Sequence, residues 1–284
     1  MRFALFAILS VFMLGFPGSF LVVGGNDGGA PDTNFASSSI LLNDAGDSAF
    51  YDCGAAGCLA SDLNIGIDYT LEFWVRCTTL AASDRRLIQL LNTANALRGE
   101  MQLNDASTTG RIRWQVFDSS TSPFGSSVLT VGGLDWYDDA WRHVAMVHDT
   151  SENDGQVRLY VDGTDEGLLS SGNNTINSNI DKITWGHPSV DPSNCRITEF
   201  RKWSTARTTT QIQNHDLCQL SCVDDTSCAA ITGLDWYVPF TEGTGTAAND
   251  NASAADFTLS SAALWDSSVP AFTNDGSNDC YDGT

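Results

Sequence analysis

Two neighbouring runs of residues most constrain how this chain can fold. The runs are 141–149 and 156–163, and both are rich in the β-branched and aromatic residues that favour strands. In the second run, every second residue from Val157 to Val161 is apolar, which is the period of a strand with one buried face. The connector ends in the dipeptide Asp154-Gly155, which accepts positive φ at little cost. The sequence therefore predicts an antiparallel hairpin here.

Short runs of the same character fill most of the remaining chain, and clusters of Gly, Asn, Asp and Ser separate them. We expect strands at 35–42, 48–51, 69–77, 87–91, 99–103, 111–117, 127–131, 180–186, 195–203, 234–240 and 257–264. Only 208–215 has the pattern of a helix, with a Thr available as N-cap and a Gln where a capping box requires one. Many short strands and one short helix predict an all-β, antiparallel sandwich or barrel.

The chain divides into a leader, one large domain and a tail. Residues 1–25 have the pattern of a secretory signal peptide, with an apolar core, a Pro-Gly break and small residues after it. An uncleaved N-terminal anchor is the alternative, because the apolar stretch would be long enough to span a bilayer without that break. We expect a flexible start at 26–34, a single domain at 35–268 and a C-terminal tail at 269–284. No later stretch is apolar enough to span a membrane.

The charge of the chain excludes one class of partner. Thirty-five acidic residues against fourteen basic ones give a formal net charge of −21. A surface of this sign repels phosphate backbones, so we do not expect a nucleic acid as partner. The acidic residues are scattered rather than gathered in blocks, which fits simple solubility as well as a calcium-rich or saline exterior.

An even number of cysteines fits an oxidising compartment and a set of disulfides. Cys53 and Cys58 flank four residues and could close a small loop. Three cysteines crowd one connector, which leaves the tail cysteine as a partner for one of them. The spacings lack the Cys-x-x-Cys pairs of zinc sites, so we do not expect zinc. The eight residues are Cys53, Cys58, Cys77, Cys195, Cys218, Cys222, Cys228 and Cys280.

Six segments in order carry a resemblance to a known group of domains. Tyr69–Val75 is similar to the strand pattern F-T-[IL]-E-x-W-V, and Leu159–Gly163 matches L-Y-V-D-G. The other similar segments are Trp141–Val144, Ile183–Gly186, Ile197–Ile212 and Leu234–Gly245. Together they resemble the laminin-G-like and pentraxin-like domains of the concanavalin A-like lectin/glucanase superfamily. The resemblance implies an antiparallel β-sandwich of the jelly-roll type.

The resemblance also implies one disulfide and a set of ion pairs. In such folds the first and last long strands of one sheet run side by side, which would place Cys77 opposite Cys195. A bridge there would close a long loop and stabilise the fold by about 4–5 kcal/mol in the chain-entropy model. The same pairing would gather a structural set of charged residues, Glu72, Arg76, Glu199 and Arg201.

Nothing in the sequence points to catalysis, so we predict no enzymatic activity. Glycoside hydrolases of this fold need two carboxylates about 5–10 Å apart, and no Glu-x-Asp-x-x-Glu or Glu-x-Asp-x-Glu run occurs. His143 and His148 face opposite sides of one strand and cannot chelate together; we interpret His143 as a packing or hydrogen-bonding residue of the sheet. Segment 243–248 fits a dinucleotide-binding pattern but lacks the helix that should follow, so we interpret it as a turn.

Calcium is the one cofactor that the acidic loops suggest. It takes six to eight oxygen ligands, often from loops. In pentraxins, calcium is bound by a loop whose counterpart here holds Asp191 and Asn194 but lacks the adjacent Glu-Gln-Asp of those proteins. The second candidate joins Asp250 to the turn of Asp44 and Asp47, because both acidic turns could meet where the domain closes. Acidic turns without an ion are the alternative in both cases.

Sugar binding is the commonest role that the resemblance implies. It uses exposed aromatic rings that stack on pyranose rings, with polar side chains that fix the hydroxyl groups. Burial in the core is the alternative for any large aromatic side chain. Four aromatic residues in or near loops are the candidates, Phe124, Trp136, Tyr137 and Trp185.

We therefore predict a secreted, non-catalytic binding module in the extracellular space or at the cell surface. Its expected partner is a glycan or glycoprotein, such as those of the extracellular matrix, bound as a lectin or adhesin would bind it, with calcium as a candidate aid. The alternative is a structural protein that self-associates through sheet edges or faces. A glycoside hydrolase of the same fold is the less favoured alternative.

Overall fold

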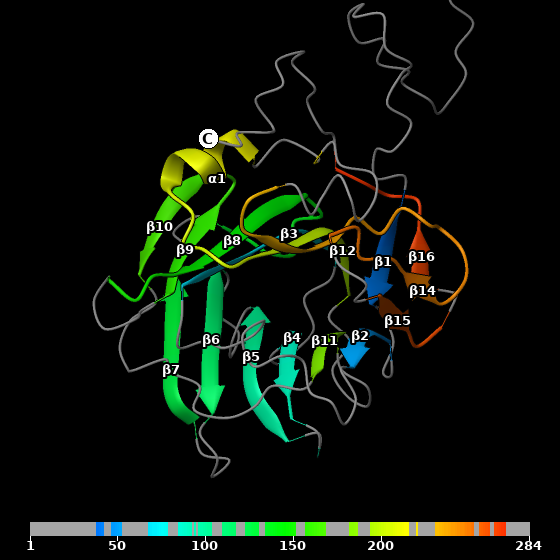
Figure 1. Cartoon of the computed structure of the whole chain (residues 1–284), viewed down its shortest axis with the longest axis horizontal. Helices are drawn as coiled ribbons and strands as arrows, with labels where there is room; N and C mark the ends of the chain where they lie inside the picture. The colour runs from blue at the N-terminus through cyan, green and yellow to red at the C-terminus, as the bar shows by residue number, and fades with distance from the viewer. Residues whose placement is uncertain are drawn as a thin grey trace, which may run out of the picture.

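Two antiparallel β-sheets of eight strands each lie face to face in the computed structural model (Figure 1). This confirms the all-β sandwich that the sequence predicts. The structure describes residues 38–42, 47–52, 68–78, 85–92, 94, 96–103, 110–117, 123–130, 134–151, 157–168, 182–186, 194–215, 220, 231–252, 256–261 and 264–270. The predicted leader 1–25 and flexible start 26–34 lie outside this part, as does most of the tail 269–284.

The first sheet, sheet A, contains the predicted hairpin. β8 (Arg142–His148) pairs with β9 (Val157–Val161), with Val144 opposite Val161; the connector 152–156 lies outside the described residues. The order across sheet A is β10 (Thr164–Leu168), β9, β8, β3 (Tyr69–Cys77), β12 (Cys195–Trp203), β1 (Ser39–Leu42) and β16 (Trp265–Asp266), and β13 (Leu234–Val238) also pairs with β12.

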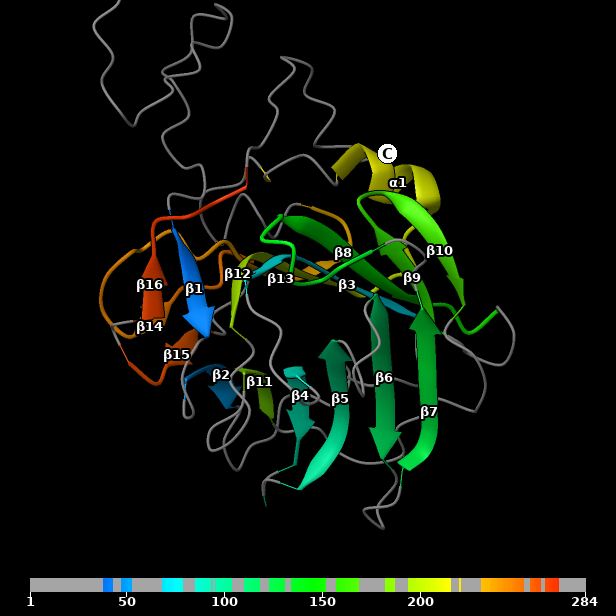
Figure 2. The ribbon, with the colours of Figure 1, turned by 180° about the vertical axis from the view of Figure 1, so that it is seen from behind.

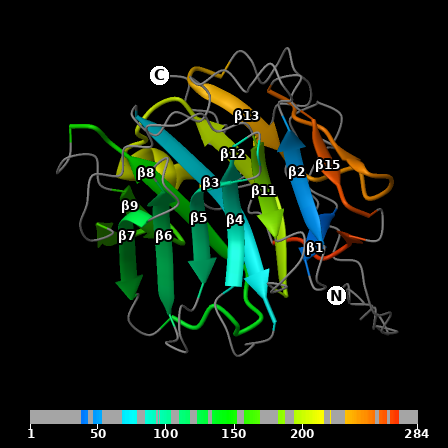
Figure 3. The same ribbon diagram turned by 90° about the horizontal axis from the view of Figure 1, so that it is seen from below.

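The second sheet, sheet B, forms the other layer. Its order is β14 (Ala247–Ala248), β15 (Phe257–Leu259), β2 (Ser48–Asp52), β11 (Lys182–Gly186), β4 (Arg85–Leu91), β5 (Leu97–Leu103), β6 (Arg111–Phe117) and β7 (Pro123–Thr130). Figure 3 shows β4 to β7 in a row in front of β3, β8 and β12 of sheet A. From behind, β7 stands at the outer end of that row (Figure 2).

The strands differ from the prediction where the sequence signal is weakest. The sequence does not predict β10, because this strand is mostly polar and Gly167, with a φ of 106°, interrupts its pairing with β9. β14 and β16 have only two residues each, which is too short to show an alternation. β13 ends at Val238 rather than at Phe240, because the positive φ of Phe240, 56°, turns the chain out of the strand.

Aromatic rings fill the space between the two sheets. Trp185 of β11 lies edge-on to Phe73 of β3 and to Phe200 of β12, with ring centroids 4.9 and 5.0 Å apart. Trp236 and Phe257 extend this cluster from β13 and β15. Such ring pairs contribute about 0.5–1.5 kcal/mol each beyond the area they bury. They fix which face of each sheet points inward, and therefore which side chains point outward.

A short helix covers the outer face of sheet A. α1 (Thr209–His215) lies beyond sheet A on the side away from β4 to β7 (Figure 1). It begins with the predicted capping box: the Thr208 N–H donates to Gln211 Oε1 at 2.9 Å, and the Gln211 N–H donates to Thr208 Oγ1 at 3.3 Å. Ile212 of α1 forms a small apolar cluster with Ala145, Val147 and Tyr160. Tyr160 is therefore buried, although the alternation of β9 places it on the outer face.

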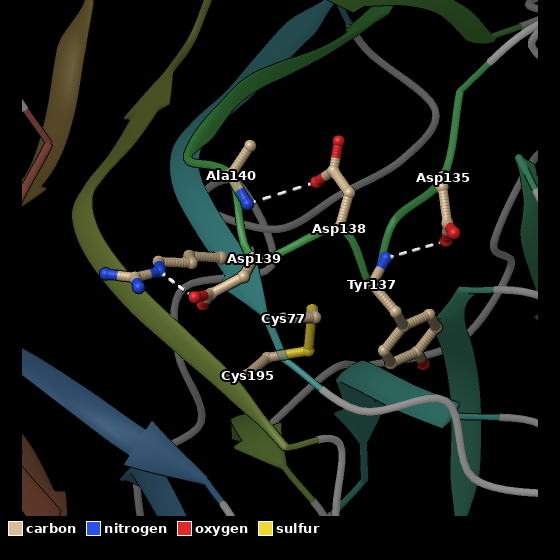
Figure 4. Close-up of a disulfide and its surroundings, with 8 residues drawn as sticks. Cys77, Asp135, Tyr137, Asp138, Asp139, Ala140 and Cys195 are labelled. Atoms are coloured by element: carbon tan, nitrogen blue, oxygen red, sulfur yellow. Dashed lines mark hydrogen bonds and ion pairs between the residues drawn. A yellow bond between two sulfur atoms is a disulfide. The ribbon is translucent and has the colours of Figure 1, made fainter.

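The disulfide between Cys77 and Cys195 is confirmed (Figure 4). The two residues are register partners on β3 and β12, and their Cα atoms are 4.1 Å apart. The bridge lies beside the turn of residues 137–140, where Arg76 forms an ion pair of 2.7 Å with Asp139 (Figure 4). The other six cysteines, Cys53, Cys58, Cys218, Cys222, Cys228 and Cys280, lie outside the described residues. No helix in the described part is long and apolar enough to cross a membrane.

Candidate functional site

A row of mainly polar side chains crosses the outer face of sheet B. Alternate residues of its central strands belong to the hydrophobic core, so the residues between them point away from the core. Phe50 of β2 lies opposite Thr184 of β11, Thr184 opposite Gln89 of β4, and Gln89 opposite Glu100 of β5. The row therefore spans four neighbouring strands, roughly 15 Å at the usual strand spacing.

Four side chains on this face form a continuous chain of polar contacts, which we call the polar ladder. Arg86 Nε lies 3.1 Å from Glu100 Oε2 as an ion pair. Gln102 Nε2 donates to the other oxygen of Glu100, Oε1, at 2.8 Å, and Arg113 Nη1 donates to Gln102 Oε1 at 3.3 Å. The ladder joins β4, β5 and β6, so its side chains are held by three strands and by one another.

The ladder exposes its cations and hides its carboxylate. The Arg86 side chain is 33% exposed and Arg113 is half-buried, whereas the Glu100 side chain is only 3% exposed. Gln102 between them is also buried. A molecule that approaches this face therefore meets guanidinium groups first.

An aromatic ring and a further cation lie on the same face. Phe50 is half-buried, and Lys182 Nζ lies 4.2 Å from the centre of its ring. A cation at this distance over an aromatic face is attracted by the ring quadrupole. The face thus combines a half-buried aromatic ring, with Lys182 over one side of it, and planar polar groups that can form hydrogen bonds.

The sequence reasoning missed these residues, although a signal for them exists. In 98–102 and 111–115 every second residue is Arg, Glu or Gln. Ordinary solvated strand faces accept any small polar residue, so such a run of large planar side chains on two successive strands could have indicated a binding face.

Three of the predicted aromatic candidates are in the core, and the prediction that they form an exposed sugar platform is wrong. Trp136 and Tyr137 are 2% and 8% exposed, and Trp185 is not exposed. All three belong to the main hydrophobic cluster between the sheets. The large apolar area of these rings is removed from water there, which outweighs any benefit of exposure. Phe124 lies in β7, and its side chain is outside the described residues, so its role stays a prediction.

The predicted calcium ligands are not assembled within the part of the chain that the structure describes. Asp250 Oδ1 accepts the N–H groups of Tyr237 at 2.8 Å and of Ala252 at 2.9 Å, so this buried carboxylate orders a turn. Asp47 and Asn194 are described as well, but no group of three or more potential ligand side chains is found there. Asp44 and Asp191 lie outside the described residues. Both calcium sites stay predictions.

The outer face of sheet A carries a second set of charges, which we call the buried charge network. Arg207 Nη1 donates to both oxygens of Glu72, at 2.8 and 3.1 Å. Arg201 forms an ion pair of 3.1 Å with Glu199 and lies 3.7 Å from Glu72. The Tyr237 hydroxyl donates to Glu199 Oε2 at 2.9 Å. All five side chains are buried.

Three residues of the predicted ion-pair set, Glu72, Glu199 and Arg201, are therefore brought together. Arg76 is not among them, because it points to the rim and pairs with Asp139. Burial lowers the pKa of Arg207, although Glu72 opposes the shift. Burial would also lower the pKa of Arg201, but its neighbours Glu199 and Glu72 together raise it. Arg207 Nη2 also donates to the Gln211 carbonyl of α1 at 3.1 Å, so the network anchors the helix to the sheet.

One buried histidine lies beside this network. His143 of β8 is next to Trp74, with ring centres 5.6 Å apart, and neither ring nitrogen has a hydrogen-bond partner in the described part of the chain. Burial lowers the pKa of His143 to about 4, while Glu72 opposes the shift. The imidazole is therefore neutral at pH 7 and packs as an uncharged ring.

Two stacked antiparallel sheets in this order, closed on one face by a short helix after the last long strand, define a concanavalin A-like β-sandwich. The chain belongs to the laminin G-type family described as the concanavalin A-like lectin/glucanases superfamily, whose model matches residues 54–213, more than half of the chain. No curated protein matches its sequence.

Two solved structures share the fold. One is a Bacteroides ovatus protein to which carbohydrate binding is attributed: it is 18% identical, with a TM-score of 0.53 over 78% of this chain and 57% of that one. The other is the binding domain of botulinum neurotoxin serotype D: it is 13% identical, with a TM-score of 0.51 over 75% of this chain and 54% of that one. The chain thus spans little more than half the length of either structure. At these identities the likeness concerns the fold alone.

Proposed function

We propose that this protein is a secreted, non-catalytic module that binds carbohydrate through the outer face of sheet B. The observation that carries the proposal is the polar ladder on the same face as the half-buried ring of Phe50. Sugar hydroxyl groups both donate and accept hydrogen bonds, and Arg and Gln side chains supply fixed planar partners for them. An aromatic ring offers its apolar face to the C–H side of a pyranose.

The ladder is suited to binding rather than to hydrolysis. A glycosidase needs a second carboxyl group beside the first, as acid and as nucleophile or base. Glu100 is the one carboxylate among the described side chains of this face, and Arg86 and Gln102 both hold its oxygens. Both oxygens of Glu100 are therefore already engaged within the ladder. We therefore propose that the face fixes a sugar without cleaving it.

Two features support an extracellular location, where glycans are abundant. The buried disulfide between Cys77 and Cys195 belongs to an oxidising compartment. The signal-peptide pattern of residues 1–25 indicates export. The partner would then be a glycan or glycoprotein outside the cell, with calcium as a candidate aid in the acidic loops.

A glycan array followed by calorimetric titration of the best ligand tests the proposal. We expect Arg86→Ala to weaken binding about tenfold or more, because charge-assisted hydrogen bonds are worth about 1.5–3 kcal/mol. Arg158→Ala is the matched control, since it also removes an arginine in an ion pair, the 2.7 Å pair with Asp165, but on sheet A. An array on which no saccharide binds, or equal losses in both variants, would contradict the proposed function. Repeating the titration with EDTA decides whether calcium takes part.

One observation favours self-association as a second candidate function. β7 is the outer strand of sheet B, pairs only with β6 among the described residues, and contains no charged residue over Pro123–Thr130. Edge strands are usually protected by charges, by Pro, by bulges or by being short, as β10 and β14 are. In β7, Pro123 and a register shift interrupt only the first residues, so 125–130 stay regularly paired and uncharged. Light scattering of the purified protein tests this candidate: a dimer that Val128→Lys converts to a monomer would support it, and a monomer at every concentration would remove it.

A further inference from the structure

The strands of the two sheets differ in charge. Sheet A strands contain six basic and six acidic residues, whereas sheet B strands contain six basic residues and only two acidic ones. The sheet B set is Arg85, Arg86, Arg98, Arg111, Arg113 and Lys182, with Asp52 and Glu100. Because the whole chain carries −21, the excess of acidic residues lies outside the strands. Sheet B is a basic element in an acidic protein.

The described side chains of this face that are both charged and accessible are positive. Arg113 and Lys182 alternate with core residues of their own strands, so they point outward. Arg86 shares their face because it lies opposite Gln102, across a β-bulge at Leu87, and pairs with Glu100. All three are half-buried. Glu100, the described acidic side chain of the face, is almost completely buried behind Arg86. A ligand therefore meets three cations and no accessible carboxylate among the described side chains.

We propose that the ligand of this face is an acidic polysaccharide, with carboxylate or sulfate groups that bind Arg86, Arg113 and Lys182. This inference rests on the proposed function and adds the chemical class of the sugar. The guanidinium fork matches a carboxylate or a sulfate with two parallel hydrogen bonds, which a neutral hydroxyl cannot use fully. Lys182, held over the Phe50 ring, lies on β11 opposite Leu91, five residues along β4 from Arg86. A polysaccharide that runs obliquely over the strands, with several sugar units, could therefore reach both cations.

The negative net charge of the protein makes non-specific binding of a polyanion unexpected. Basic proteins adsorb polyanions without specificity, but a chain of −21 repels them at long range. That repulsion is screened beyond about 8 Å at physiological salt, whereas contacts with partly buried cations are screened much less. Binding of an acidic sugar by this protein would therefore identify a local basic site.

Pairs of polysaccharides with the same backbone test the proposal on the purified full chain at about 0.15 M salt, a concentration that screens distant charges. One pair is polygalacturonate and its methyl ester, and the other is dextran sulfate and dextran. A short single-stranded DNA serves as a polyanion without the saccharide. We expect a charged member of at least one pair to bind about tenfold tighter than its neutral partner, and the pair that responds tells carboxylate from sulfate.

Other outcomes separate this inference from the function on which it rests. Equal binding of charged and neutral members would overturn the acidic ligand while carbohydrate binding stands. No binding to these polysaccharides together with a blank glycan array would overturn both. If DNA bound as tightly as the best saccharide, the site would recognise negative charge alone, and the proposal that its ligand is a polysaccharide would be overturned.

Charge-removing variants locate the site. We expect Arg113→Gln and Lys182→Gln each to lower the affinity for the charged polysaccharide, by about tenfold for the arginine. Arg158→Gln removes the same charge from a similarly half-buried position on sheet A and should leave the affinity within about twofold, since a charge far from the site contributes little at this salt. Equal losses in Arg113→Gln and Arg158→Gln would show that net charge, and not this face, controls binding, and would overturn the proposal.

Discussion

The outer faces of the two sheets carry similar side chains in opposite situations. On sheet A, Glu72, Arg201 and Arg207 are buried beside α1 and satisfy one another. On sheet B, Arg86 and Arg113 are part exposed. The Arg201 side chain is 1% exposed, against 33% for that of Arg86.

The difference shows that burial under another element, rather than residue type, decides whether charged side chains on a strand face serve stability or can bind a ligand. A buried charge that loses its partner is costly, so the network under α1 can hardly change without loss of the fold. A part-exposed arginine keeps its hydration and can exchange one partner for another. The first face is therefore expected to control stability, and the second to control binding.

The largest expected effect comes from the disulfide at the rim of sheet A. Replacing both Cys77 and Cys195 by Ala removes a bridge between residues 118 positions apart, and we expect the free energy of unfolding to fall by about 4–5 kcal/mol. Denaturant unfolding of the oxidised proteins measures this. A loss below about 1 kcal/mol would mean that the pairing of β3 with β12 needs no covalent support, against the chain-entropy estimate.

The next effect tests the buried charge network directly. Arg201→Met leaves Glu199 and Glu72 buried with one cation fewer, so we expect a loss of about 3–5 kcal/mol in the free energy of unfolding. Arg113→Met on sheet B is the comparison, because it removes the same group from a part-exposed position. If urea unfolding showed that both variants lose the same free energy of unfolding, the distinction between the two faces would be wrong.

The sequence predicted the framework of sheet A better than it predicted the polar ladder of sheet B. Cys77, Glu72 and Arg201 lie on long alternating strands whose pairing follows from a family pattern, so their neighbours could be inferred. The cover by α1 could not, because an alternation shows which residues share a face but not what lies on it. Likewise, the positions of Trp136 and Trp185 in or near loops left both exposure and burial open, and the structure places both rings between the sheets.

The pH dependence of stability provides a third test, centred on His143. Its pKa of about 4 in the folded protein lies below the ordinary value of 6.5, so the unfolded chain binds more protons between these values. Stability should therefore fall as the pH is lowered from about 6.5 to about 4, by up to roughly 3 kcal/mol from this residue. His143→Phe should flatten this part of the curve. Parallel curves for the two proteins would show that His143 takes up its proton without cost.

The smallest expected effect on stability is that of Arg113→Gln on sheet B. It tests whether the outer faces of the two sheets really differ in role. Arg113 is half-buried and donates to a neutral amide oxygen of Gln102, so Arg113→Gln should change the free energy of unfolding by less than about 1 kcal/mol. The same substitution is expected to reduce binding of an acidic polysaccharide about tenfold. Thermal unfolding and binding measured on one preparation give both values. If the variant instead lost several kcal/mol of stability, the polar ladder would be a structural brace like the network of sheet A. Its exposed guanidinium groups would then be the ends of that brace, and the binding site would have to be sought elsewhere on the molecule.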